Sequence, residues 1–284
     1  MNLETLFENF VKERIYLKNV SPKTVLWYRA SFKYFERHRQ GRELTKENLN
    51  ATVVEMRSRG ISAESVNVYM RAVNSFLSWL HENEHTPEHL RIKQIKTEKK
   101  LVPTYKEAEL RLLLGWKPQG FYEHRLYALI ALLIDTGIRI EEAITLKTEK
   151  VDLENLLITV TGKGNKERII PISYELRKIL FRWSKQHKHR IFLPTHDGAK
   201  VGYNNFRREF NKLCEKLGIE DMKGTFHVLR HTFAYNHVRN GGNLFALQKM
   251  LGHETLQMTR RYCELQTEDL QNIHQKTSIL GKLR

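Results

Sequence analysis

The chain has 284 residues and a formal net charge of +16, and 40% of its residues are hydrophobic. There is enough apolar material for a packed core, which excludes a wholly disordered chain, and no apolar run approaches the length of a membrane span. The basic excess favours a polyanion as the partner, although a cationic protein without such a partner would have a similar composition. Two cysteines do not form a disulfide framework and no signal peptide is visible, so we expect a cytoplasmic protein.

The first third of the chain predicts a helical domain over residues 1–86. Apolar side chains recur at steps of three and four from Leu3 to Val11 and again from Val66 to Leu80, as on one face of a helix. Between these two stripes, Ser21 can cap a further helix that has Pro22 at its first position. The apolar face of that helix carries Val25, Tyr28, Phe32 and Phe35.

Residues 87–102 predict a basic linker. Thr86 and Pro87 stop the preceding helix, and few large hydrophobic side chains follow. The segment is instead rich in cations, which stand at Arg91, Lys93, Lys96, Lys99 and Lys100. Such a segment is able to run along a phosphate backbone, but a solvated linker would have the same composition.

Residues 103–284 predict a second domain that is mainly helical and contains a small β-sheet. Thr104 and Glu107 have the spacing of a capping box, and an apolar helix follows them. The clear strand signals are residues 156–160 and 168–172, which a hairpin turn at residues 162–165 joins. The predicted fold class is therefore mainly α, with the small β-sheet confined to this domain.

Six residues of the second domain are able together to attack a phosphodiester without a metal. They are Arg139, Lys163, His227, Arg230, His253 and Tyr262. Two guanidinium groups can clamp the non-bridging oxygens and stabilise the charge of a five-coordinate phosphorus. A histidine can take the proton of a phenol, and a lysine can protonate the leaving oxygen. Taken singly, each residue is more often an ion pair or a core side chain than a catalytic group.

Four sequence blocks carry a resemblance to a known family. They are TGIRIEEA, GKGNKERIIPI, HVLRHTFA and LGHETLQMTRRY, and they contain the six residues in order. Their order and separations are similar to those of the tyrosine recombinase (phage integrase) family, and the resemblance covers nearly the whole chain. It implies a helical core-binding domain plus a tyrosine-recombinase catalytic domain. The compact two-domain type favours a chromosome- or cointegrate-resolving enzyme, and we favour a transposon resolvase.

The resemblance implies the chemistry at the scissile phosphate. Tyr262 would be the nucleophile, leaving a 3′-phosphotyrosine and a free 5′-hydroxyl. Arg139 and Arg230 would activate the phosphate, and Lys163 would be the general acid for the leaving 5′-oxygen. No nucleotide is then needed for ligation, because the phosphotyrosyl ester conserves the energy of the bond.

Three further roles follow from the same resemblance. His227 would act as an acid/base, and His253 would hydrogen-bond the phosphate. Glu142 would orient Arg139. An ordinary ion pair between the two residues on one helix would hold Arg139 in nearly the same way, so the two interpretations differ little. The departures from the family pattern are mild, since Ile138 replaces the commoner leucine and Glu141 the commoner serine.

The family resemblance implies a partner, double-stranded DNA with an inverted-repeat core site, that two domains clamp from opposite faces. The residues expected to contact DNA in the first domain are Lys23, Tyr28, Arg29, Lys33 and Arg71. We expect a homo-tetramer on two synapsed sites, whose protomers exchange the apolar helix that follows Thr267. The alternative is a tail that packs on its own domain.

No cofactor and no metal are expected. The stretch from His81 to His85 matches the zinc-protease pattern HExxH, but Pro87 ends the helix and no third ligand has a convincing spacing. The sequence thus predicts a metal-independent site-specific recombinase, a resolvase or integrase of a mobile element that acts on the bacterial nucleoid. Two alternatives stay open, a type IB topoisomerase-like relaxing enzyme and a non-catalytic DNA-binding regulator.

Overall fold

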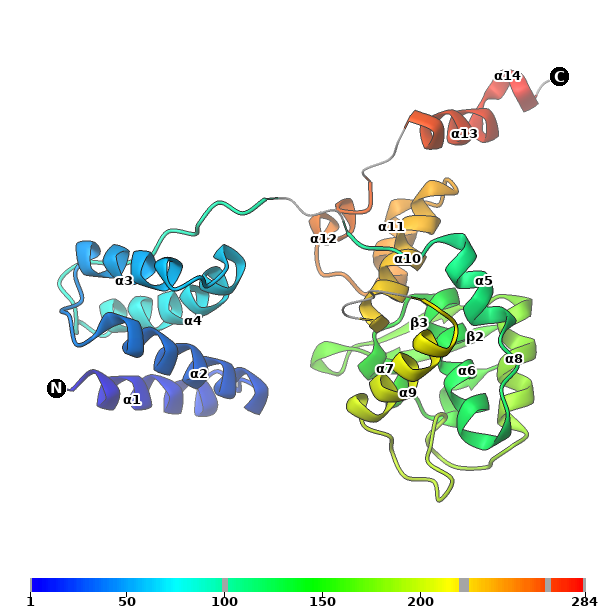
Figure 1. The fold of residues 1–284 in the computed structure, drawn as a ribbon, viewed down its shortest axis with the longest axis horizontal. Helices are drawn as coiled ribbons and strands as arrows, with labels where there is room; N and C mark the ends of the chain where they lie inside the picture. Colours follow the sequence, from blue (N-terminus) through cyan, green and yellow to red (C-terminus); the bar gives the residue numbers. More distant parts are fainter. Residues whose placement is uncertain (1, 99–101, 220–224, 264–266, 283–284) are drawn as a thin grey trace. The chain divides into compact units, whose positions relative to one another are not determined.

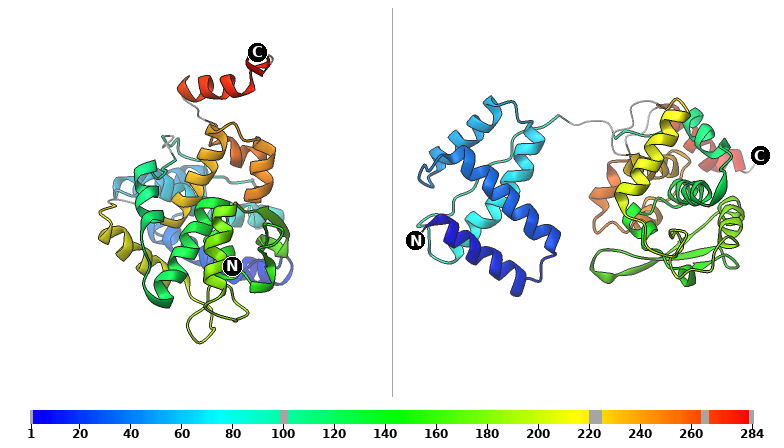
Figure 2. Two further views of the ribbon diagram at one scale, coloured as in Figure 1. Left: turned by 90° about the vertical axis from the view of Figure 1, so that its right-hand side faces the viewer. Right: turned by 60° about the horizontal axis from the view of Figure 1, so that its bottom comes forward.

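The computed structural model describes residues 2–98, 102–219, 225–263 and 267–282. The chain divides into two compact units, Met1–Lys100 and Leu101–Arg284. Both units appear in Figures 1 and 2. Within the described residues, no helix is both long enough and apolar enough to cross a bilayer.

Four helices form the first unit, coloured from blue to cyan in Figure 1. They are α1 (Leu3–Tyr16), α2 (Pro22–Arg39), α3 (Lys46–Ser58) and α4 (Ala63–Glu82). Side-chain caps define where all four begin, because Asn2, Ser21, Thr45 and Ser62 each accept a backbone amide of the following turn. The predicted cap at Ser21, followed by Pro22, is therefore confirmed.

Aromatic rings fill the core of the first unit. Phe7 of α1 stacks on Phe32 of α2 with ring centroids 3.9 Å apart, and Phe76 of α4 meets Phe7 edge-on at 5.3 Å. Phe10 makes a further edge contact with Tyr28 at 5.1 Å. Such pairs add to the free energy gained by burying the rings, so α1, α2 and α4 are held around one apolar centre.

The chain that follows α4 also packs on the first unit. The side-chain amide of Asn74 pairs with the backbone of Ile92 through two hydrogen bonds of 2.8 and 2.9 Å, and Asn67 pairs in the same way with Ile95 at 2.8 Å. Leu90 and Ile92 are buried in the aromatic core cluster. Part of the segment that the sequence assigned to a linker is thus fastened along α4, because two buried aliphatic side chains hold it there.

Helices and one small sheet form the second unit, as Figure 1 shows in green to red. The α-helices are α5 (Glu107–Gly115), α6 (Gly120–Thr136), α7 (Ile140–Ile144), α8 (Tyr174–Ser184), α9 (Tyr203–Lys216), α10 (Thr225–Arg239), α11 (Leu244–Leu251), α12 (Leu256–Arg260), α13 (Thr267–Thr277) and α14 (Ile279–Lys282). Helix α6 is the central one, since its residues from Leu126 to Leu133 are almost all buried and it packs against α8 and α10.

The sheet has three antiparallel strands in the order β1 (Val151–Asp152), β2 (Leu157–Thr161) and β3 (Glu167–Pro171). The register pairs Val160 with Arg168. A short 3₁₀ turn, η1 (Thr148–Lys150), leads into β1, and a second one, η2 (Lys163–Asn165), lies between β2 and β3. The mainly α fold class with a small sheet is confirmed, and the predicted hairpin is β2 with β3. The two-residue strand β1 was not predicted, because so short a run carries no periodic signal.

The start of α5 differs from the prediction. The backbone amide of Lys106 donates to the carboxylate of Glu109 at 2.6 Å, so the helix begins at Glu107 and the predicted capping box at Thr104 is wrong. The reason is tertiary: the backbone amide of Tyr105 donates to Oγ1 of Thr232 on α10 at 2.8 Å. The Tyr105 ring is buried in the core of the unit, which keeps this residue extended rather than helical.

Candidate active site

A glycine turn places the first arginine. Helix α6 ends at Thr136, and Gly137 follows it with φ +60°, a conformation that favours glycine. A Cβ at this position would also overlap the ring of Phe233 on α10. The turn delivers Arg139 to the start of α7, where its backbone amide donates to Oε2 of Glu142 at 2.8 Å.

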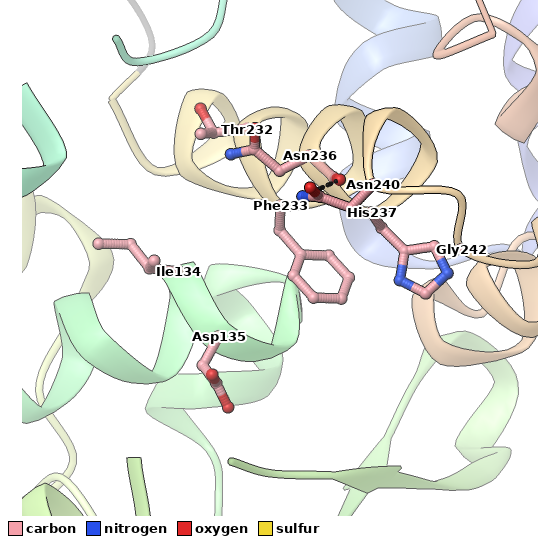
Figure 3. A pocket seen from close by; sticks show the side chains of 8 residues that line it. All are labelled: Ile134, Asp135, Thr232, Phe233, Asn236, His237, Asn240 and Gly242. Carbon is pink, nitrogen blue, oxygen red and sulfur yellow. Dashed lines mark hydrogen bonds between the residues drawn. The ribbon is translucent and has the colours of Figure 1, made fainter. Parts of the chain in front are cut away.

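Phe233 also lines a cavity of about 390 Å³ between the end of α6 and α10. Figure 3 shows its ring directed from α10 toward α6, with Asp135 across the space and His237 near Gly242. Among the side chains that the structure describes, none of the predicted catalytic residues lines this cavity. Its contribution to the site is therefore indirect, through the close packing of Phe233 on Gly137.

A buried carboxylate joins two arginines. Glu142 accepts from Nη1 of Arg139 at 3.0 Å and from Nη1 and Nη2 of Arg168 on β3, each at 2.8 Å. Burial would raise the pKa of Glu142, but the hydrogen bonds and positive charges of Arg168 and Arg139 outweigh it and hold that pKa below its ordinary value. The ionised carboxylate thus orients Arg139 as expected, and Arg168, which sequence reasoning missed, is its second partner.

The second arginine is almost completely enclosed. Arg230 on α10 has 5% of its surface exposed, and it donates to the carbonyl of Gly137 at 2.6 Å and to that of Leu251 at 2.8 Å. Burial, and then the like charge of Arg139, lower the pKa of Arg230 to about 10. The guanidinium still carries its charge at neutral pH, so the interior of the unit holds a cation ready for an anionic ligand.

The end of α11 brings the two arginines and a histidine together. Helix α11 ends at Leu251, and Gly252 follows it with φ +62°, where a Cβ would lie 3.1 Å from the guanidinium of Arg168. Nη2 of Arg139 donates to the carbonyl of Gly252 at 3.3 Å, and Nη2 of Arg230 lies 3.1 Å from Nε2 of His253. Loops distant in sequence therefore converge on this one turn.

His253 is held in a neutral form. Its Nδ1 lies 2.8 Å from Oγ1 of Thr259. Burial, followed by the charges of Arg230 and Arg139, lowers the pKa of His253 to about 4. A cavity of about 620 Å³ opens beside these groups, and its lining includes Arg139, His253, Arg168 and Lys166. Such a cavity, lined by cations and a hydrogen-bonding imidazole, suits a phosphate group.

The tyrosine is buried beside a histidine that sequence reasoning did not select. Tyr262 is 3% exposed, and its hydroxyl lies 2.8 Å from Nδ1 of His231 on α10. The Arg261 guanidinium lies 5.2 Å from the centre of the Tyr262 ring, and its Nη2 lies 3.2 and 3.1 Å from the two ring nitrogens of His231. The ring of His253 is roughly parallel to that of Tyr262, with centroids 6.5 Å apart.

Of the six predicted catalytic residues, His227 and Lys163 remain, and the structure describes fewer contacts for them. His227 on α10 keeps much of its surface open to solvent, but its ring is partly shielded by the protein, and this desolvation, then the charges of Arg230 and Arg139, lower its pKa. The backbone of Lys163 lies in the turn η2 between β2 and β3, as predicted for the hairpin tip, but its side chain lies outside the described part of the structure. Among the described residues, no group of three His, Cys, Asp or Glu side chains is arranged to hold a metal.

Family profiles match both units. That of the "Phage integrase family" matches residues 103–269, more than half of the chain, and that of the "Phage integrase, N-terminal SAM-like domain" matches residues 7–96. The chain belongs to the phage integrase family. It is a site-specific tyrosine recombinase, and hence a DNA strand-exchange enzyme.

Curated relatives of the recombinase agree with this assignment. It is 26% identical over 273 residues to the tyrosine recombinase XerC of Chromobacterium violaceum, covering 92% of this chain and 91% of the relative. It is 28% identical over 274 residues to the tyrosine recombinase XerA of Thermococcus kodakarensis, covering 94% and 93%. The recombinase therefore spans nearly the full length of these relatives.

Solved structures share the fold. The Tn1549 transposon integrase (residues 82–397) in complex with circular intermediate DNA matches with a TM-score of 0.80 and 19% identity, covering 98% of this chain and 100% of that one. The XerH recombinase bound to its palindromic difH substrate, in a post-cleavage complex, matches with a TM-score of 0.75 and 21% identity, covering 96% and 84%.

The first unit of the recombinase presents most of the predicted DNA-contacting residues on its surface. Lys23 and Lys33 are exposed on α2, and Arg71 on α4 borders a groove of about 700 Å³. Arg29 is exposed but pairs with Glu8 through two hydrogen bonds of 2.5 and 2.8 Å. The groove beside Arg71 is lined further by His89, Arg91 and Lys93.

The prediction for Tyr28 needs correction. Its side chain is 8% exposed and packs edge-on against Phe10 in the aromatic core. The 8% that stays exposed leaves little of this side chain for DNA, so Tyr28 belongs chiefly to the core of the first unit.

Proposed function

We propose that this recombinase cleaves one DNA strand by attack of Tyr262 on the scissile phosphate, leaving a 3′-phosphotyrosine and a free 5′-hydroxyl. One observation carries the proposal. Arg139 and Arg230 are both hydrogen-bonded to the turn at the end of α11, which also carries His253, and a cavity large enough to admit a phosphate is lined by Arg139 and His253. The buried Tyr262 lies against the same histidine.

The arrangement provides the charge that the reaction needs. A phosphodiester under attack gathers negative charge on its non-bridging oxygens, and preformed cationic donors stabilise it at no cost in reorganisation. A guanidinium has five N–H donors, and the bonds described for Arg139 and for Arg230 use only some of them. The remaining donors would face the phosphate, with His253 as a further hydrogen-bond partner.

Proton transfer completes the proposed chemistry. As the bond between Oη of Tyr262 and phosphorus forms and the bond to the 5′-oxygen breaks, the leaving oxygen takes a proton from Lys163, with His227 as a further acid/base. The number of phosphoester bonds stays constant, so the reverse attack by a 5′-hydroxyl reseals the strand. We expect cleavage and ligation to proceed in EDTA.

A covalent adduct tests the nucleophile. Duplexes are selected for binding to the full-length chain from a randomised inverted-repeat library, nicked near the centre to trap cleavage, and run on denaturing gels. The wild type should give a protein–DNA adduct, and Tyr262→Phe should give none. Tyr174→Phe, at an exposed position on α8, is the matched control and should retain the adduct. An adduct that survives in Tyr262→Phe would assign the nucleophile elsewhere.

We propose that four protomers act on two synapsed inverted-repeat sites and exchange their carboxyl-terminal helices. In the single chain, Leu270, Ile279 and Leu280 of α13 and α14 are 55%, 73% and 77% exposed. Exposed apolar side chains on a terminal helix favour a partner surface, here that of a second copy. The first turn of α13 contacts its own unit, since Nε of Arg239 on α10 donates to the carboxylate of Asp269 at 2.5 Å.

Sedimentation of the chain on one and two sites tests the assembly. The variant Leu280→Asp should bind a single site normally but fail to form the two-site complex, and Tyr122→Asp, at an exposed position on α6, should assemble as the wild type does. Relaxation of supercoils by a monomer, without exchange between sites, would instead indicate a type IB topoisomerase-like enzyme. DNA binding without any adduct would indicate a non-catalytic regulator.

The first unit is proposed to hold the duplex by its backbone through Lys23, Lys33 and Arg71, with Arg29 exchanging Glu8 for phosphate. Contacts of this kind set position on the duplex and carry little sequence information. We further propose a cytoplasmic, nucleoid-bound resolvase or integrase of a mobile element. Two target sites in direct repeat on one plasmid test this, because a resolvase should release the intervening circle.

A further inference from the structure

The hydroxyl of the proposed nucleophile has a specific partner. Nδ1 of His231 lies 2.8 Å from Oη of Tyr262, and the two rings lie 5.7 Å apart between centroids. Both side chains are largely withdrawn from solvent. His231 lies one helical turn after His227, so both histidines project from the same side of α10, while Arg230 between them donates to the carbonyls of Gly137 and Leu251.

We propose that His231 is the general base that takes the proton of Tyr262 during strand cleavage. The proposal rests on the proposed role of Tyr262 as nucleophile and adds the group that activates it. A phenol is a weak nucleophile near neutral pH, and an adjacent base at hydrogen-bond distance raises its reactivity. The geometry already meets this distance criterion before DNA is bound.

The other two histidines of the site are differently engaged. Nδ1 of His253 bonds to Thr259, and its Nε2 lies beside Arg230. His227 is exposed, and within the described residues the structure gives its ring no hydrogen-bonding partner. Of the three, His231 is the histidine whose ring nitrogen contacts the tyrosine hydroxyl.

The charges around His231 keep its imidazole unprotonated, which leaves a ring nitrogen able to accept a proton. The same charges make it a weaker base than an ordinary histidine. Burial, then the positive charge of Arg261 and the nearby rings and charges of His227 and Arg230, lower the pKa of His231 to about 4. The imidazole is therefore neutral at neutral pH, and in the tautomer without a proton on Nδ1 the tyrosine hydroxyl donates to it. Arg261, which lies against both rings, stabilises the developing negative charge on the phenol oxygen.

The step balances in both directions. In cleavage, the proton of Oη passes to Nδ1 of His231 while an electron pair of Oη forms the bond to phosphorus, and the electrons of the breaking bond move to the 5′-oxygen, which is protonated by the general acid. In ligation, the 5′-hydroxyl attacks phosphorus and the imidazolium of His231 returns its proton to the departing Tyr262. No oxidant, nucleotide or metal enters the balance.

The test combines His231→Asn with two chemical bypasses in single-turnover cleavage by the full-length chain. Asparagine can still hydrogen-bond the hydroxyl but cannot accept its proton, so we expect a loss of about 10²- to 10⁴-fold in the rate with unchanged DNA affinity. Replacing Tyr262 by 3,5-difluorotyrosine, a more acidic phenol, should recover at least about tenfold of that loss, because the base is then less needed. A 5′-bridging sulfur in the DNA, which needs no protonation to leave, should not restore the rate.

Matched variants separate the possible outcomes. Lys163→Ala should behave in the opposite way, recovered by the sulfur and not by the fluorinated tyrosine. His237→Asn controls for the loss of an imidazole that lies on the same helix but outside the catalytic residues. His231→Gln is measured in parallel, so that a folding defect in one variant leaves the test intact. The proposal is overturned if the folded variants cleave within about threefold of the wild type, or if the sulfur restores them. Failure of the nucleophile assignment shows separately, as an adduct in Tyr262→Phe.

Discussion

In the first unit most of the described arginines and lysines lie on the surface around a core of aromatic rings. In the second unit Arg168 and Arg230 are largely enclosed, Arg139 is partly exposed, and all three are bonded to one turn. Surface cations act independently, so each adds a small increment to the affinity for a polyanion. Enclosed cations share partners, so the loss of one disturbs the others. Substitutions in the second unit should therefore act steeply on rate, and those in the first unit gradually on affinity.

The steepest effect is expected at Arg230. Arg230→Gln removes a preformed cation from the phosphate site and unpairs the carbonyls of Gly137 and Leu251, so single-turnover cleavage should fall by about 10³-fold. The matched control is Arg125→Gln, a buried arginine of the same unit that bonds to Pro194 and Glu209. That variant should lower the melting temperature but cleave normally where folded. Similar rates in the two variants would refute the distinction between them.

A smaller loss is expected at Arg168. Lysine cannot reproduce the two bonds to Glu142 together with the bond from Nε to the carbonyl of Met250. Arg168→Lys should therefore let Arg139 shift and reduce the cleavage rate by about 10²-fold, with the affinity for DNA retained. Arg177→Lys, which loses only a bond to the carbonyl of Leu153, is the control. A rate for Arg168→Lys within twofold of the wild type would show that Glu142 orients Arg139 without it.

The first unit should respond gradually. Arg71→Gln removes one exposed cation beside the groove on α4, so DNA affinity should fall several-fold and the slope of log K against log salt should lessen by about 1. The same change is expected on selected and on unrelated duplexes, since a phosphate contact carries no sequence information. Arg111→Gln, on α5 with Glu107, controls for the loss of net charge. An effect confined to the selected site would mean that Arg71 reads bases.

The smallest effect concerns the pH dependence of stability. The pKa values of His231 and His253 are about 4 in the folded chain, below the ordinary value of 6.5. The unfolded chain then binds up to one more proton per histidine between these values, so stability is full above about pH 6.5 and is lost as the pH falls toward 4. Amide hydrogen exchange in α10, corrected for intrinsic rates, should show this loss. His253→Asn should make the stability depend less steeply on pH. An unchanged slope of stability against pH would contradict the lowered pKa of His253.

The sequence predicted the parts of the site that lie within single blocks. Gly137 ahead of Arg139, Glu142 three residues on and Gly252 before His253 are local features, and the structure places them together. Arg168 was missed because its partner is 26 residues away along the chain, on α7, and the pattern of a strand does not indicate which carboxylate an inward side chain meets. The pairing of Arg168 with Glu142 is set by the tertiary structure and not by local sequence.

At two other positions where the structure differs from the prediction, the sequence did contain a usable signal. His231 stands four residues after His227, a spacing that puts both on one side of a helix. The prediction nevertheless included His227 and Arg230 from this block and omitted His231. Tyr28 belongs to the apolar stripe with Phe32 and Phe35, which favoured burial over DNA contact. The start of α5 had no usable signal, because the bond from Tyr105 to Thr232 joins segments more than a hundred residues apart.

Asn67 and Asn74, which fasten the segment after α4 to the first unit, have a consequence for the avidity of the two units for DNA. The chain is held to the first unit as far as Ile95, and the second unit holds it again from Tyr105. Whatever path the intervening residues take, they span at most about 35 Å. A tether this short gives the second module a high effective concentration at DNA that the first has bound. Each module can then bind weakly and release quickly while the pair stays on its target.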